Sequence, residues 1–323
     1  PLIMRLSFYC VLEVGIEDPD EPKDPETPHF IPAYSQKVKA SKEFQTFQFD
    51  HSFVLNSLKS SMEGYVFHNQ PLDTDDLLEQ TVKLFNSCKT SLELFDMLHN
   101  MRAYDDSTYA HSLNVALICR RIGKWLKVDA ATLDTLTLCG LLHDIGKLKI
   151  PDEILNKPGK YTDEEFDLVK RHTKFGYELL KTLNIDPHIK KAALLHHERC
   201  DGSGYPLKAT QKDLDDFSMV VAIADVYDAM TAARSYRAPL CPFQVIERFE
   251  QEGLQKYKPK FILTFLQHIA STYQNNRVLL SNGQSANIVM LNQQHLARPI
   301  VQLNDNSCID LSTRLDLHIQ SIL

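Results

Sequence analysis

Helical periodicity is the dominant pattern of the chain between about residue 73 and residue 273. Apolar residues recur at intervals of three and four, which predicts helices over 73–101, 107–126, 129–144, 162–183, 187–197 and 217–233. Thr162 and Glu165 have the spacing of a capping box, and Pro187 suits a first helical turn. The segment 217–233 is apolar on nearly every side, so we expect it to be central. The sequence therefore predicts a mainly α protein with a helical domain over residues 73–275.

Both ends of the chain are predicted to contain β-structure. Short apolar runs at 3–14, 52–58 and 64–67 predict an N-terminal segment, residues 1–72, with β character and no assigned role. Five of the fifteen prolines lie between Pro19 and Pro32, which predicts a loop or linker there. Runs at 277–281, 286–291, 299–303 and 308–311, with a turn at Asn282-Gly283, predict a C-terminal β extension over 276–323.

The composition is typical of a soluble globular protein, with 43% hydrophobic and 24% charged residues. The net charge of −7 argues against a general nucleic-acid or anionic-membrane surface, so an anionic substrate would need a local source of positive charge. Seven scattered cysteines without a CxxC pair indicate neither a disulfide framework nor a thiolate zinc site. We identify no membrane span and no export signal, and we expect a cytoplasmic protein.

Five histidines and two aspartates fall on inward helix faces or at helix ends, and they are His111, His143, Asp144, His172, His196, His197 and Asp225. An ordinary hydrogen bond could explain the His143-Asp144 pair alone, but so many buried polar groups cannot all satisfy one another. Imidazoles and carboxylates together suit a divalent transition metal. Seven ligands exceed the needs of one ion, so we expect two ions that share a carboxylate, an arrangement typical of phosphoester hydrolysis. Iron or manganese is favoured, with zinc, nickel, cobalt or magnesium as alternatives.

Five motifs in order carry a resemblance to a known family. They are HSLNVA from His111, HDIGK from His143, HTKFG from His172, HHERCDGSGYP from His196, and IADVYDAMTAARSYR, which contains Asp225. Over about residues 104–258 the chain resembles the HD-GYP subgroup of the HD phosphohydrolases, which are bacterial phosphodiesterases that hydrolyse cyclic di-GMP at a metal centre. The resemblance implies an HD-type helical core.

The resemblance also implies a role for each residue. One ion would be held by His111, His143, Asp144 and Asp225, and the other by Asp144, His172, His196 and His197, with Asp144 as the bridging, catalytic carboxylate. Lys147 would contact the scissile phosphate and help to neutralise its charge or protonate the leaving oxygen. Gly146, which precedes it, is expected to end the helix. Further substrate contacts are expected from Gly204, Tyr205, Asp228, Arg234 and Arg237. For Asp228, one helical turn after Asp225, the alternatives are that it orients a ligand or water or supports packing.

Two departures from the family pattern bear on these expectations. Ser107 occupies the position where some members place a Glu that helps to hold a third metal, so we expect two ions. After Pro206 the family usually continues with glycines, whereas this chain continues with LKATQKDLDD, which leaves the shape of the substrate-side loop open.

The leading functional prediction is hydrolysis of cyclic di-GMP to pGpG, and onward to GMP as an extension. One alternative is a hydrolase for another nucleotide, such as 3′,3′-cyclic GMP-AMP. The other is a signalling module that binds cyclic di-GMP and turns it over poorly. A homodimer or a signalling partner would be contacted through the flanking segments.

Overall fold

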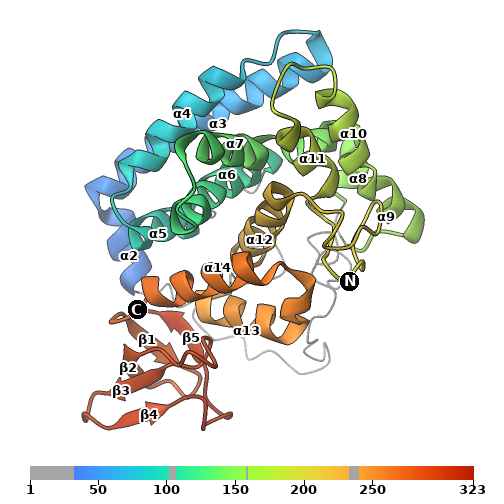
Figure 1. Cartoon of the computed structure of the whole chain (residues 1–323). Helices are drawn as coiled ribbons and strands as arrows, with labels where there is room; N and C mark the ends of the chain where they lie inside the picture. Colours follow the sequence, from blue (N-terminus) through green and yellow to red (C-terminus); the bar gives the residue numbers. More distant parts are fainter. Residues whose placement is uncertain (1–32, 102–106, 158, 233–239) are drawn as a thin grey trace.

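The structure, a computed structural model, describes residues 33–101, 107–157, 159–232 and 240–323 (Figure 1). A helical body precedes a small sheet at the C-terminal end. The helices are α2 (Ala33–Ala40), α3 (Lys42–His68), α4 (Thr74–Ser87), α5 (Ser91–Met101), α6 (Thr108–Trp125), α7 (Ala130–Leu142), α8 (Asp152–Leu155), α9 (Asp163–Lys170), α10 (His172–Leu180), α11 (Pro187–Leu195), α12 (Asp216–Thr231), α13 (Pro242–Glu252) and α14 (Pro259–Thr272). Two short 3₁₀ helices, η1 (Ile145–Lys149) and η2 (Leu254–Lys256), connect them. The predicted mainly α fold is confirmed.

The described residues 33–68 of the N-terminal region form two helices, α2 and α3, and contain no strand, so the prediction of β character is wrong for them. The runs 52–58 and 64–67 both lie inside α3. Ser41 caps this helix by accepting a hydrogen bond from the backbone amide of Phe44. Its buried apolar side chains recur at helical spacing and join the main core, and they are Phe44, Phe47, Val54, Leu55, Leu58 and Met62. The run 3–14 and the proline-rich stretch lie outside the described residues.

The helices predicted from the periodicity are present, and two of them are interrupted. The segment 73–101 forms α4 and α5, because Cys88 adopts an extended backbone between them. The segment 162–183 forms α9 and α10, which meet at Arg171. The capping box of Thr162 and Glu165 is confirmed. The central position of α12 is also confirmed, because every residue from Ser218 to Thr231 is buried.

The C-terminal residues form a five-stranded antiparallel sheet in the order β4-β3-β2-β1-β5. Its strands are β1 (Arg277–Leu280), β2 (Ser285–Met290), β3 (Ile300–Leu303), β4 (Cys308–Asp310) and β5 (Ile319–Ile322). Four of them were predicted, and β5 was not. The sheet lies at one end of the molecule, next to α13 and α14 in Figure 1, and the thiol of Cys241 at the start of α13 contacts the carbonyl of Ile319 at 3.6 Å.

Candidate metal centre

The seven predicted ligands converge from six elements of the helical body. His111 lies on α6, His143 caps α7, and Asp144 follows it at the start of η1. His172 begins α10, His196 and His197 follow α11, and Asp225 lies in the middle of α12. All seven are buried, and the most exposed of them, His111, is only 8% exposed. Residues separated by more than a hundred positions in the sequence therefore share one buried polar site.

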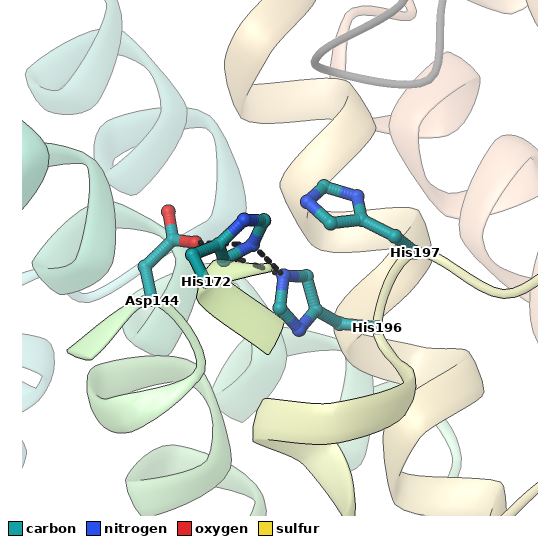
Figure 2. A group of neighbouring side chains, drawn as sticks. All are labelled: Asp144, His172, His196 and His197. Carbon is teal, nitrogen blue, oxygen red and sulfur yellow. Dashed lines mark hydrogen bonds and ion pairs between the residues drawn. The ribbon is translucent and has the colours of Figure 1, made fainter. Parts of the chain in front are cut away.

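Asp144 lies between two groups of histidines. Its Oδ1 is 3.4 Å from Nε2 of His172 and 3.7 Å from Nε2 of His196. Its Oδ2 is 3.3 Å from Nε2 of His143 and 3.6 Å from Nε2 of His111. Ligand atoms lie within 4.8 Å of one another in each of two groups, one of Asp144, His172, His196 and His197 and the other of His111, His143 and Asp144. Figure 2 shows the first group, with the four side chains directed toward one another.

Asp225 lies beside both groups without belonging to either. Its Oδ1 is 3.0 Å from Nε2 of His111, and its Oδ2 is 3.7 Å from Nδ1 of His197. The carboxylate therefore faces the centre from the side of α12.

Hydrogen bonds to the outer ring nitrogens orient the imidazoles. Nδ1 donates to a carbonyl of the preceding helical turn in three cases, at 2.7 Å from His143 to Gly140, 2.7 Å from His172 to Val169 and 2.9 Å from His196 to Ala192. Because a carbonyl only accepts, Nδ1 must carry the proton, and the lone pair of Nε2 points into the site. Metal-ligating histidines are typically oriented in this way.

The electrostatics of the site also suit a cation. Burial lowers the pKa of His172 to about 4 and holds the pKa values of His196 and His197 well below their usual range, so these rings are neutral at pH 7. Burial opposes ionisation of Asp144, but the charge of Lys147 and the interactions with His143 and His172 together outweigh it and hold the carboxyl pKa well below its usual range. Neutral imidazoles and an ionised carboxylate are the protonation states that metal binding requires.

His111 differs from the other histidines because two carboxylates flank it. Burial alone would lower its pKa, but hydrogen bonds to Asp225 and Asp228 outweigh burial and raise the pKa to about 10. These carboxylates require a positive charge beside them, which either a proton or a metal ion can supply.

Two buried atoms test whether the donor set fits a metal. Nε2 of His143 and Oδ2 of Asp225 make no hydrogen bond within the described part of the chain, although both face the site. A buried polar atom without a partner costs roughly 1–3 kcal/mol, and coordination to a cation would remove that cost. The residues therefore fit a divalent metal centre.

The segment after Asp144 brings a lysine and a close backbone contact to the site. Lys147 is 3% exposed, and its Nζ lies 2.6 Å from Oδ2 of Asp144. The expectation that Gly146 ends the helix is wrong, because α7 ends at Leu142 and Gly146 lies within η1. A Cβ at this position would lie 1.9 Å from the carbonyl oxygen of His172. Glycine is required because the backbones of η1 and α10 touch there.

The loop after His197 is packed directly on the site. The Tyr205 ring lies 4.7 Å from that of His197, and the Tyr205 amide donates to the His197 carbonyl at 3.2 Å. A Cβ on Gly204 would lie 2.4 Å from Cα of Glu198, so the loop backbone sits against the ligand-bearing segment. These contacts place the Tyr205 ring against His197, at the side of the candidate metal centre.

Glu198 binds the backbone of this loop beyond Pro206, a role that the sequence did not predict. Its carboxylate, on a residue only 2% exposed, accepts hydrogen bonds from the amides of Leu207 at 2.5 Å and Ala209 at 3.0 Å. The available signal was its position, directly after two candidate histidine ligands and before a glycine-rich turn.

The remaining predicted residues have different outcomes. Asp228, which was expected to contact substrate or to orient a ligand, is buried, and its Oδ2 accepts a hydrogen bond from Nδ1 of His111 at 2.8 Å. Ser107 caps α6, so its hydroxyl accepts from the amide of Ala110. Arg234 and Arg237 lie outside the described residues.

Comparison with known proteins places this site in a family. A family model described as HD domain matches residues 76–261. The chain belongs to the HD domain family. All seven candidate ligands lie within the matched range of this HD domain protein, and the predicted family membership is confirmed.

Curated relatives of this HD domain chain are cyclic-dinucleotide phosphodiesterases by name. A 3′3′-cGAMP-specific phosphodiesterase of Vibrio cholerae is 34% identical over 56% of the chain and 35% of its own length. Cyclic di-GMP phosphodiesterases of Pseudomonas aeruginosa and Thermotoga maritima are 33% and 35% identical over 64% and 54% of the chain, and 50% and 48% of their own lengths. The chain thus spans between about a third and a half of these relatives.

A solved structure shares the fold. An HDG"Y"P protein from Bdellovibrio bacteriovorus aligns with a TM-score of 0.50 at 19% identity, over 73% of the chain and 78% of its own. Among the described residues, no helix is both long enough and apolar enough to cross a bilayer.

Proposed function

We propose that the chain is a metal-dependent phosphodiesterase that hydrolyses cyclic di-GMP to pGpG, and pGpG further to GMP. The observation that carries the proposal is the position of Asp144, one oxygen of which faces His172 and His196 while the other faces His111 and His143. A single carboxylate between two sets of imidazoles is what a pair of ions with a shared ligand requires, and such pairs are typical of phosphoester hydrolysis.

The two ions would have different ligand sets that share Asp144. His111, His143, Asp144 and Asp225 would hold one, and Asp144, His172, His196 and His197 would hold the other. Iron and manganese suit this mixture of nitrogen and oxygen donors. When bound, such ions supply hydroxide at neutral pH and stabilise negative charge on phosphate oxygens.

Side chains around the centre supply the remaining requirements of a phosphodiester substrate. Lys147 places a buried positive charge 2.6 Å from Asp144, in a protein whose net charge is −7. Its ammonium would bind the scissile phosphate and donate a proton to the leaving oxygen. The Tyr205 ring, whose centroid lies 4.7 Å from that of His197, would stack against the nucleotide. Gly204 keeps this loop close to the centre, and Arg234 and Arg237 remain predicted phosphate ligands.

The test combines metal analysis with turnover. Protein purified without oxygen is analysed for metals, loaded with Fe²⁺ or Mn²⁺ and incubated with cyclic di-GMP, and the products are separated by chromatography. We expect pGpG, followed by GMP. Asp144→Ala should lose both bound metal and turnover, whereas the control Asp75→Ala, at an exposed position of α4, should retain both. A metal-loaded wild-type protein that forms no product would refute the proposal.

A second substrate is favoured by a specific observation, because a relative named for 3′3′-cGAMP matches as well as those named for cyclic di-GMP, at 34% against 33% and 35% identity. Both nucleotides should therefore be assayed in parallel at equal concentration. If calorimetry shows that cyclic di-GMP binds while no turnover is detected, the remaining alternative is favoured, a signalling module that binds this nucleotide and turns it over poorly. Association through the flanking segments, as a homodimer or with a signalling partner, stays a prediction.

A further inference from the structure

The long helix α3 lies outside the matched HD domain range yet contacts the elements that carry the site. The family match begins at residue 76, whereas α3 ends at His68. The helix runs along one side of the helical body next to α4 (Figure 1). Its side chains and backbone make polar contacts with α6, which bears His111, with η1, which directly follows Asp144, and with α10, which begins at His172.

Two contacts connect α3 to α6 on either side of His111. Nε2 of His51 lies 3.2 Å from Oδ1 of Asn114, and both residues are buried. The hydroxyl of Tyr109 donates to the Glu63 carboxylate at 2.9 Å. Tyr109 and Asn114 lie two residues before and three residues after His111, so α3 holds α6 on both sides of this candidate ligand.

The C-terminal end of α3 connects to the other two elements. The Tyr65 hydroxyl donates to the carbonyl of Leu179, near the end of α10, at 2.5 Å. Nζ of Lys149, the last residue of η1, donates to the carbonyl of Val66 at 3.3 Å. Lys149 follows Lys147 by two residues, so this contact lies next to the Asp144 segment.

We propose that α3 is a positioning element of the metal centre, because one continuous helix fixes the relative positions of α6, η1 and α10. Glu63 and Tyr65 are its principal positioning residues. The inference rests on the proposed two-ion centre. Ligand distances in a metal site tolerate about 0.2 Å, so a small displacement of one element weakens binding. The functional unit consequently begins before residue 73, at α3.

The experiment measures metal binding rather than turnover. Full-length protein freed of metal is titrated with Co²⁺, and visible absorption reports both affinity and ligand geometry. Tyr65→Phe, which removes a hydrogen bond, should weaken Co²⁺ binding by about three- to tenfold. Glu63→Gln, which replaces the charge-assisted hydrogen bond from Tyr109 by a neutral one, should weaken it by up to about threefold. Both variants should alter the absorption bands.

Two matched controls separate positioning from stability. Glu43→Gln makes the same change at the exposed start of α3. Tyr161→Phe removes a hydroxyl that, like that of Tyr65, donates to a backbone carbonyl, here that of Leu155 at 3.1 Å. Both controls should keep the wild-type affinity and spectrum, even where thermal stability falls as far as in Tyr65→Phe.

The outcomes distinguish this inference from the proposed function. Wild-type affinity and spectrum in both Glu63→Gln and Tyr65→Phe would overturn the positioning role and leave the metal centre intact. A wild-type protein that binds no Co²⁺ would overturn the metal centre itself, and the inference with it.

Discussion

Gly146→Ala should separate two elements of the metal centre. The new methyl group would lie 1.9 Å from the carbonyl oxygen of His172 and 2.4 Å from the amide nitrogen of Gly176. Both obstacles are backbone atoms of α10, so no side-chain rotation can relieve them. Since ordinary contact begins at 3.4 Å, η1 and α10 would have to move apart by about 1.5 Å.

This displacement sets the size of the effect. Overpacked cores in which side chains can adjust lose about 1–3 kcal/mol, so a backbone clash should lower the free energy of unfolding by at least about 3 kcal/mol. The same movement would carry Asp144 away from His172, now 3.4 Å apart, by several times the 0.2 Å or so that a metal site tolerates. We therefore expect loss of both stability and metal.

The assay is urea unfolding of the metal-free protein, followed by metal analysis after reconstitution. Gly176→Ala is the matched control, because it adds the same methyl group on the opposite side of the same contact. There the nearest atoms lie at 3.4 Å, and alanine in a helix is favoured over glycine by up to about 1 kcal/mol. Equal stability of the two variants would refute the reasoning.

Three further predictions concern residues around the site. Asp228→Asn should weaken metal binding about 10- to 100-fold by loosening His111, measured by metal titration, and unchanged affinity would contradict the role assigned to Asp228. Glu198→Ala should release the Tyr205 loop, seen as faster amide hydrogen exchange there with metal content retained, and unchanged exchange would count against it. Thr162→Ala should lower the free energy of unfolding by about 1 kcal/mol through loss of a helix cap without altering metal affinity.

The convergence of the candidate ligands could be predicted from the sequence because their chemistry and their positions in helices agree. His143, His172 and His196 lie at helix ends, where carbonyls of the preceding turn can hold Nδ1 and direct Nε2 inward. Asp225 was identifiable because an isolated carboxylate in an apolar helix needs a positive partner. These arguments depend on local structure alone, which the sequence specifies well.

The N-terminal helix and the last strand could not be predicted in the same way. Runs such as 52–58 and 64–67 are short and apolar, and at that length a helix and a strand are indistinguishable by periodicity. β5 contains few apolar residues and is defined by pairing with β1, some forty residues earlier. The importance of Gly146 was missed because it depends on the approach of α10, a contact between separate elements.

The hydrogen bonds of Glu198 have a consequence for how the loop after Tyr205 can vary. The carboxylate binds backbone amides, which every residue except proline provides, so the side chains of residues 207 and 209 are free to differ. Lys208 lies between them at a φ of 56°, where glycine or asparagine would be less strained. When residues 207, 208 and 209 are randomised, most sequences should keep the structure of this loop. Glycine and asparagine should be enriched at position 208. Insertion of a single residue should disrupt the loop. One residue lengthens the chain by about 3.3–3.6 Å, so one of the two amides could no longer donate to the Glu198 carboxylate.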